Sequence, residues 1–356
     1  MNVSKRSSIA AVMVVTACIA VLAAGVSGSI AAPSSSSAAP KGYTGVEATL
    51  PTQYKRPTLK AGTSCTIGFQ NPVGANETLS FLQKGVIKQA AAFKCKVIAL
   101  DDKLNPDKQV SNMQQLLAQN VDAIIFYPLD PKATQPVLKQ AKSQGVPVLA
   151  IDATFGNPNA PAPNITTQVW QGRDIQAYLH AGAMRAANKG GKIGLIGIGF
   201  PVPALKYLTS RQSFYAKKNG LTVVGTQDNP SDDVTGGEKA ANALLQRYPD
   251  MNGVIGYNDP SALGAAAAAR GVGRDLVIVG NNGSSDGLAG VKSGRLAATV
   301  QVDPVGWGSQ LVLASYSLIT KQNLPLPKVI VRPATLITKA NVGSSPSWSA
   351  QVKAIR

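Results

Sequence analysis

The sequence predicts an α/β protein made of two doubly wound lobes of parallel β-sheet. The chain has 356 residues, which at about 150 residues per domain is enough for two hydrophobic cores. Short apolar runs alternate with segments of helical period, as in parallel sheets covered on both faces. This alternation occurs twice along the chain, so each series predicts one lobe.

The start of the chain is predicted to lie outside both lobes. A positively charged start precedes an uncharged stretch, Ile9 to Ala24, and small residues follow, which indicates a signal peptide over residues 1–28. A retained membrane anchor is the alternative interpretation. The sequence Val-Thr-Ala-Cys ending at Cys18 also fits a lipid-attachment pattern in which Cys18 is acylated. In each case the mature chain works outside the cytoplasm.

Two further segments are predicted to lack regular structure. Residues 29–61 are rich in Ser, Ala, Pro and Thr and have no sustained apolar period, which favours an extended tether. Residues 346–356 are predicted to form a loose tail.

The first series of predicted strands begins at Cys65. Its apolar runs cover residues 65–69, 96–100, 122–127 and 146–151. Asn105-Pro106 and Asp130-Pro131 each place a capping side chain before a proline, which predicts helix starts. Pro136 falls inside the second of these helices, so a kink is expected there.

The second series repeats this pattern. Its apolar runs cover 192–199, 221–225, 253–257 and 276–280, and helices are predicted near 204–218, 235–247 and 260–270. Later runs at 296–302 and 328–338 predict that the chain crosses between the lobes again. The predicted lobes are therefore 62–167 with 303–332, and 168–302 with 333–345.

Two cysteines are predicted to form a disulfide bond. Cys65 opens the first strand and Cys95 precedes the second, and these strands are neighbours in a doubly wound sheet. Without Cys18 they are the two cysteines left in an oxidising compartment. Two free buried thiols are the alternative.

Composition limits the chemistry. One histidine and three cysteines exclude a metal centre built from several His or Cys ligands, so no metal or cofactor is predicted. His180 has no plausible Ser or Cys partner, which argues against a catalytic triad and against an enzyme. The net charge is +17, but the lysines are not clustered with aromatic residues, so no nucleic-acid site is predicted. Attraction to anionic lipid headgroups or wall polymers is the preferred interpretation of the charge, and solubility is the alternative.

Polar residues follow several predicted strands, where open α/β sheets bind their ligands. These candidates are Asn71, Asn76, Asp152, Asn258 and Asn282. A carboxamide both donates and accepts hydrogen bonds, so the set suits a neutral ligand with several hydroxyl groups. Asp259 is interpreted as a helix cap and Asn281 as a turn residue.

Residues 62–339 resemble the type I periplasmic sugar-binding proteins, the ribose- and galactose-binding group that serves ABC importers. The resemblance rests on NPDKQVSNMQQLLAQNVDAIIF at 105–126, VPVLAID at 146–152, GVIGYNDPSALGAAAAA at 253–269 and VIVGNNGSSDG at 277–287. It implies two lobes joined by a hinge of three crossovers, with the ligand cleft between them. It also implies a monomer that binds a neutral carbohydrate-like ligand without a cofactor and delivers it to a membrane permease.

The resemblance assigns individual ligand contacts. Asn76, Asp152 and Asn258 match sugar-binding positions, and Arg211 matches an arginine of the second lobe. Ala153 and Asn282 stand where ribose binders have arginine and aspartate, which argues against ribose itself. Trp170 is the candidate for stacking on a sugar ring, whereas Trp307 is assigned to the core.

The predicted function is therefore an extracytoplasmic receptor that captures a small sugar or sugar alcohol by hinge closure. The alternative is a sensor subunit that engages a chemoreceptor or sensor kinase. A transcriptional regulator of the lactose-repressor type would need a helix-turn-helix where this chain has its signal and tether.

Overall fold

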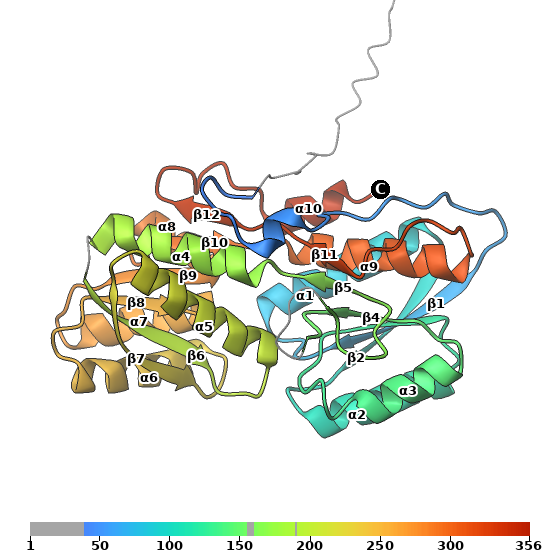
Figure 1. Ribbon diagram of the computed structural model, residues 1–356, viewed down its shortest axis with the longest axis horizontal. Coiled ribbons are helices and arrows are strands. Elements are labelled where there is room, and N and C mark those ends of the chain that lie inside the picture. Colours follow the sequence, from blue (N-terminus) through green and yellow to red (C-terminus); the bar gives the residue numbers. More distant parts are fainter. Residues whose placement is uncertain (1–38, 155–159, 189–190) are drawn as a thin grey trace, which may run out of the picture. The chain divides into compact units, whose positions relative to one another are not determined.

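The computed structural model describes residues 39–154, 160–188 and 191–356 (Figure 1). Their strands form two six-stranded sheets, with orders β11-β5-β4-β3-β1-β2 and β12-β10-β9-β8-β6-β7. The predicted α/β class with two doubly wound lobes is confirmed. Within the described residues, no helix has the length and apolar character needed to cross a bilayer.

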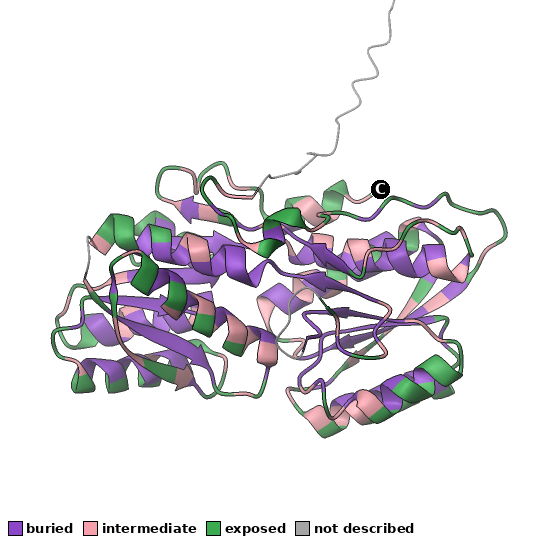
Figure 2. Ribbon diagram, viewed as in Figure 1, coloured by how far each residue is buried: buried purple, intermediate pink, exposed green. Residues whose placement is uncertain are grey.

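The first sheet is parallel throughout. Its strands are β1 (Cys65–Asn71), β2 (Cys95–Asp101), β3 (Ala123–Phe126), β4 (Val148–Ile151), β5 (Thr167–Trp170) and β11 (Val329–Val331). Helices α1 (Glu77–Ala92) and α9 (Pro304–Ile319) pack on one face, and α2 (Pro106–Ala118) and α3 (Gln135–Ser143) pack on the other. Both faces are covered, so the central strands are buried, as Figure 2 shows.

The second sheet is parallel except for one edge strand, β12, which runs antiparallel to β10. Its strands are β6 (Lys192–Ile198), β7 (Thr222–Asn229), β8 (Gly253–Gly256), β9 (Val277–Asn282), β10 (Ala298–Gln301) and β12 (Thr335–Thr338). Helices α4 (Arg173–Asn188) and α5 (Pro203–Lys218) cover one face. The other face carries α6 (Val234–Arg247), α7 (Asp259–Gly271) and α8 (Ser285–Ser293).

The chain passes between the sheets three times. It crosses from β5 to α4, from β10 to α9, and from β11 to β12. All of β5 pairs within the first sheet, so the first crossover follows Trp170, whereas the sequence placed it at residue 167.

The segment from residue 39 to 61 packs onto the fold and is not an extended tether. It forms a short 3-10 helix, η1 (Val46–Thr49), and buries Tyr43, Glu47 and Tyr54. The Pro51 oxygen accepts a hydrogen bond of 2.8 Å from the main-chain nitrogen of Val331. The expectation failed because the Ser- and Pro-rich composition masks a few widely spaced anchors. Residues 29–38 of the predicted tether, and Cys18, lie outside the described residues.

The expected loose tail is also structured. Residues Trp348–Ala354 form α10, and Trp348 is only 4% exposed. Its ring lies 5.5 Å from that of Phe81 in α1, and its indole nitrogen donates to the Val302 oxygen at 3.0 Å. One aromatic residue therefore fixes a helix too short to show a period.

The Cys65–Cys95 disulfide is confirmed. The two residues are register partners at the start of β1 and β2, with 4.5 Å between their Cα atoms. Helix α3 begins at Gln135 and not at Pro131, so Pro136 lies in its first turn. The expected internal kink is therefore not needed, because a proline at this position has no intrahelical hydrogen bond to lose.

Candidate functional site

A cavity lies where the carboxyl ends of strands from both sheets meet. Its interior volume open to water is about 70 Å³. Its polar lining side chains are Asn76, Thr78, Tyr127, Gln171, Arg173, Asp232, Tyr257, Asn258 and Asn282. Position and polarity match the cleft expected from the sequence.

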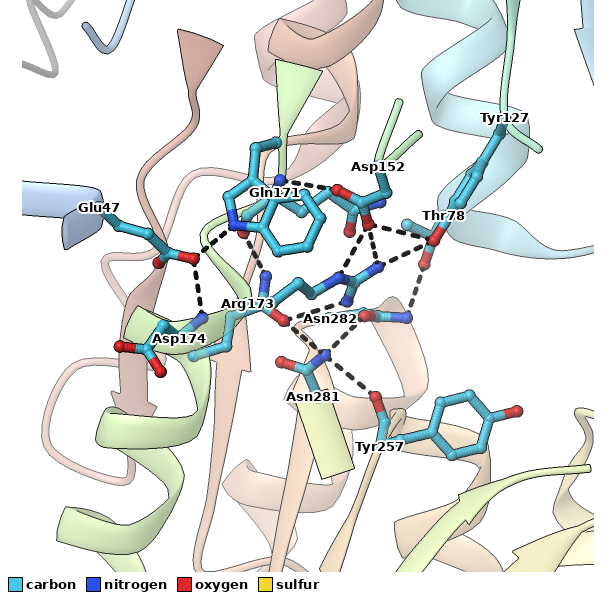
Figure 3. A network of polar contacts seen from close by, with 12 residues as sticks. Glu47, Thr78, Tyr127, Asp152, Gln171, Arg173, Asp174, Tyr257, Asn281 and Asn282 are labelled. Carbon is cyan, nitrogen blue, oxygen red and sulfur yellow. Dashed lines mark hydrogen bonds and ion pairs between the residues drawn. The ribbon is translucent and has the colours of Figure 1, made fainter. Parts of the chain in front are cut away.

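An arginine held by a buried carboxylate forms one side of the cavity (Figure 3). Arg173 begins α4, and its Nε and one terminal nitrogen lie 2.9 and 2.8 Å from a single oxygen of Asp152. The other Asp152 oxygen accepts from the main-chain nitrogen of Gln171 at 2.9 Å. Both charged residues are almost fully buried, so the pair fixes the guanidinium in one position.

Two further contacts hold the guanidinium. It donates to the Tyr127 hydroxyl at 2.9 Å and to the Gln176 side-chain oxygen at 3.1 Å. Burial disfavours the charged form of Arg173, but the adjacent Asp152 carboxylate outweighs this and raises its pKa above the usual value. Arg173 is therefore a permanent cation in the cavity wall.

A second carboxylate faces the cavity from the other lobe. Asp232 follows β7 with a φ of 58°, in the left-handed region. Its carboxylate accepts hydrogen bonds from the Tyr257 hydroxyl, from Asn258 at 2.8 Å and from Asn76 at 3.3 Å. Burial raises the pKa of Asp232, and these hydrogen bonds oppose the shift.

Two asparagines at the end of β9 complete the polar lining. Asn281 donates to Gln176 at 3.1 Å and to the Tyr257 oxygen at 3.0 Å, which links it to the Arg173 network (Figure 3). Asn282 donates to the Thr78 hydroxyl at 3.2 Å, across the cavity from one lobe to the other. Asn281 is thus more than the expected turn residue, because its amide connects the Arg173 network to Tyr257 within the second lobe.

Much of the remaining lining is apolar. Leu79, Leu104, Val202, Leu205 and Trp307 contribute to it. Trp307 is 1% exposed and its indole nitrogen has no hydrogen-bond partner among the described residues. The residue assigned to the core is thus buried, and it also borders the cavity.

Three predicted contacts line the cavity, namely Asn76, Asn258 and Asn282. Asn76 caps α1 and Asn258 caps α7 through their side-chain oxygens, which leaves their NH₂ groups to face Asp232. Asp152 lies behind the lining, where it positions Arg173. Asp259 is not the helix cap expected, because Asn258 takes that role. Asp259 is instead fully buried and accepts a hydrogen bond from the Thr299 hydroxyl.

Three other predicted contacts lie elsewhere. Asn71 is buried against Leu79 and Gln83 behind the cavity wall. Trp170 is fully buried and donates to Glu47, so its ring cannot stack on a ligand. Arg211 forms an ion pair with Asp174 on the far side of α4.

Arg173 and Asp232 are the residues that the sequence reading missed. Arg173 lies in the crossover after β5, where Trp170 is the predicted contact. The arginine absent at Ala153 is supplied by Arg173, which contacts the same aspartate. Asp232 could have been noticed because it follows the predicted strand at 221–225 in an Asn-Pro-Ser-Asp turn sequence.

A family model described as periplasmic binding protein domain matches residues 67–323. The chain belongs to this family. It is therefore a solute-binding protein and not an enzyme, and family membership implies that the protein is exported.

Curated relatives agree with this assignment. The ribose import binding protein of Bacillus subtilis is 30% identical over 256 residues, 71% of this chain and 82% of the relative. A xylitol-binding protein of Mycolicibacterium smegmatis is 32% identical over 241 residues, 66% of each chain.

Solved structures of periplasmic binding proteins share the fold. A solute-binding protein from Bacillus halodurans with bound myo-inositol has a TM-score of 0.71 at 22% identity, covering 83% of this chain and all of that chain. One from Agrobacterium vitis with bound α-D-tagatopyranose has a TM-score of 0.73 at 22% identity, covering 79% of this chain and 96% of that chain.

Proposed function

We propose that this periplasmic binding protein is the receptor of an ABC importer for a small, uncharged sugar or sugar alcohol. The observation that carries the proposal is the cavity between the lobes, where one guanidinium, one carboxylate and several carboxamides converge. Curated relatives are named for ribose, xylitol and D-apiose, which are all small neutral polyols or sugars.

The charges of the cavity favour a neutral ligand. Arg173 is already neutralised by Asp152, and the Asp232 carboxylate is satisfied by three donors from Asn76, Tyr257 and Asn258. An anionic ligand would place a second negative charge beside Asp232 in a largely buried space, which is costly. Hydroxyl groups, in contrast, both accept from Arg173 and donate to Asp232.

The apolar wall gives the ligand an orientation. Leu79, Val202 and Leu205 face the C–H side of a sugar ring or polyol chain, while its hydroxyl groups meet the amides. The unpartnered indole N–H of Trp307 is a donor for one ligand oxygen. We assign the ligand contacts to Asn76, Arg173, Asp232, Asn258, Asn282 and Trp307.

Ligand capture proceeds by closure of the two lobes. Asn76 and Asp232, Thr78 and Asn282, and Glu77 and Ser285 are hydrogen-bonded pairs that cross the cavity. A ligand that touches both lobes adds contacts in the closed form only, so it shifts the population toward closure. The closed form is the one presented to the permease.

The amino-terminal segment permits two routes of processing, cleavage of a signal peptide over residues 1–28 or lipid attachment at Cys18. We expect the mature protein to act as a monomer. Intact-mass measurement of the protein from its native membrane distinguishes the two routes, because a cleaved and acylated chain starts at Cys18 and carries an added lipid mass.

A carbohydrate screen tests the proposed function. Ligands that bind the native state raise the melting temperature by mass action. We expect at least one pentose, hexose or sugar alcohol to do so, and calorimetry to show that Arg173→Gln weakens its binding by about tenfold or more, as for loss of a charged hydrogen bond. Arg185→Gln, exposed on the same helix, is the control and leaves affinity unchanged.

Two outcomes would contradict the proposal. One is that no neutral carbohydrate shifts the melting temperature while a charged metabolite does. The other is that Arg173→Gln binds the sugar as tightly as the Arg185→Gln control.

A further inference from the structure

The excess positive charge of this protein is not spread evenly over the sequence. Four stretches, residues 53–76, 78–100, 304–332 and 339–356, contain no Asp or Glu. They carry Lys55, Arg56, Lys60, Lys84, Lys88, Lys94, Lys96, Lys321, Lys328, Arg332, Lys339, Lys353 and Arg356. The lack of acidic residues in these stretches predicts a localised positive potential.

The fold brings much of this charge to one face of the first sheet. The arm before β1, helix α1 and helix α10 lie together there, beside α9 (Figure 1). We call this surface the basic face, and define it by the exposed residues Lys55, Arg56, Lys60, Lys84, Lys88, Lys94, Lys353 and Arg356.

Hydrogen bonds and a cation–π contact tie these segments to one another. Arg56 of the arm and Gln89 of α1 both donate to the main-chain oxygen of Arg356. The guanidinium of Arg56 also lies 4.9 Å from the ring centre of Phe93, just after α1. Lys60 bonds to the Thr320 oxygen at 2.5 Å, at the end of α9. The cations of three distant segments therefore share one surface.

The nearest Asp and Glu side chains are engaged elsewhere. Glu77 starts α1 at the cavity end and bonds to Ser285 of the other lobe. Asp303 precedes α9 and forms an ion pair with Arg332. Neither of these acids neutralises the basic face.

The opposite face of the same sheet has a different pattern. There Asp107 lies beside Lys108, and Asp130 lies two residues before Lys132, so charges of both signs alternate. The basic face is therefore a local feature, not a consequence of net charge alone.

Exposed apolar side chains lie among the cations of the basic face. Ile87 is 44% exposed, between Lys84 and Lys88 on α1. Leu59 is also 44% exposed, next to Lys60. A soluble polyanion gains nothing from such groups, whereas a bilayer interface accepts apolar and cationic side chains together.

We propose that the basic face docks this protein on the anionic lipid headgroups of a membrane. Each Lys or Arg close to such a surface strengthens binding by about fivefold. Leu59 and Ile87 insert at the boundary between headgroups and acyl chains. Docking concentrates the receptor at the surface in which its permease lies, and it needs no occupied sugar site.

Vesicle binding of the full chain tests the proposal. The probes are phosphatidylcholine vesicles with and without phosphatidylglycerol. The test variant is Lys55→Glu/Lys88→Glu/Lys353→Glu, and the matched control is Lys132→Glu/Lys139→Glu/Lys142→Glu on the opposite face. Both variants change the net charge equally, and the amino-terminal stretch is the same in both.

The expected result is selective loss of binding. The test variant loses about tenfold or more of its affinity for phosphatidylglycerol vesicles, and the control changes by less than about twofold. Added salt removes the difference, because it screens exposed charges. On pure phosphatidylcholine all three proteins bind equally. A Lys→Gln version of the test variant, which removes charge without reversing it, gives an intermediate loss.

Three outcomes would overturn the proposal. Equal loss in both variants would mean that net charge alone attracts the protein. Unchanged binding of the test variant, with its melting temperature intact, would mean that another surface docks. Binding to soluble poly(glycerol phosphate) as tight as to vesicles would make the partner a polymer and not a bilayer.

Discussion

The Asp152–Arg173 pair shows how one residue acts through another. Asp152 does not line the cavity, yet its two oxygens fix both the guanidinium of Arg173 and the main chain at Gln171. Since removing one partner of a buried pair leaves the other charge uncompensated, the pair is best tested with a substitution of equal size.

We predict that Asp152→Asn lowers sugar affinity by about tenfold to a hundredfold, because Arg173 loses a charge-assisted anchor worth about 1.5–3 kcal/mol. Calorimetry with the sugar found by screening measures this, and urea unfolding reports the accompanying loss of stability. Unchanged affinity would mean that Arg173 does not contact the ligand.

His180, the single histidine of the chain, is a buried neutral group. Burial lowers its pKa to about 3. The unfolded chain therefore binds one more proton than the folded chain between pH 3 and 6.5, so His180 makes the fold less stable as the pH falls through this range.

We predict that His180→Gln removes this pH dependence. The difference in unfolding free energy between wild type and variant should shrink by about 1.4 kcal/mol per pH unit below pH 6.5. Comparing the two proteins is necessary because burial raises the pKa of Asp102 and of Asp259 to about 6, which has the opposite effect. A constant difference across this range would contradict the assignment.

At the residue scale, ligand-binding side chains that follow a strand could be predicted from the sequence, whereas those in the crossovers between the sheets could not. Asn76, Asn258 and Asn282 were found because each follows an apolar run that is recognisable as a strand. Arg173 was hidden, because no local pattern marks where a chain leaves one sheet for another. The prediction that Arg211 contacts the ligand was wrong. The resemblance indicates that Arg211 lies on a helix, but it does not establish which face of that helix carries the side chain.

At the element scale, the disulfide joins two neighbouring strands at their first residues. It closes a loop with a sequence separation of 30 residues. We predict that Cys65→Ala/Cys95→Ala lowers the free energy of unfolding by about 3–4 kcal/mol, chiefly through the entropy of the unfolded chain. Urea unfolding measures it. Equal stability of the variant and the oxidised wild type would contradict this account.

Trp348 is the one buried side chain of helix α10, and Val352 packs beside it. We predict that Trp348→Ala releases this helix, so that its amides exchange hydrogen much faster while those of β1 and β3 are unchanged. Hydrogen-exchange mass spectrometry measures both, and Trp307 serves as an internal reference in the core. Protection of α10 that survives the substitution would assign its docking to other contacts, such as the Gln301–Pro346 hydrogen bond.

The long helices and the buried strands could be predicted from the sequence, whereas η1 and α10, which are short, could not. The continuous apolar strands and capped helices follow from local sequence, because burial on both faces imposes a recognisable pattern. Segment 39–61 and α10 have no such pattern. They are held by a few separate anchors such as Glu47 and Trp348, whose partners lie more than a hundred residues away or in other elements.

At the scale of the whole molecule, three hydrogen-bonded pairs cross the cavity. The Glu77–Ser285 pair does not belong to the cavity lining, so it reports on closure and not on ligand contact. We predict that Glu77→Ala lowers sugar affinity by a few fold, because it reduces the population of the closed form.

Small-angle scattering measures this effect directly. Without sugar, the Glu77→Ala variant should have a larger radius of gyration than wild type, and saturating sugar should abolish the difference. Glu238→Ala, which does not border the cavity, is the control. A weaker affinity with unchanged scattering would mean that Glu77 acts on the ligand itself.

The amino-terminal arm has a consequence for how this protein is made. Its Pro51 and Thr52 oxygens bond to Val331 and Arg332, near the other end of the chain. During export the arm at Pro51 and Thr52 would leave a translocation channel long before Val331 and Arg332. The arm can therefore form these hydrogen bonds only when almost the whole chain has been exported. Such distant pairing slows folding, so the newly exported polypeptide stays incomplete until nearly all of it has arrived.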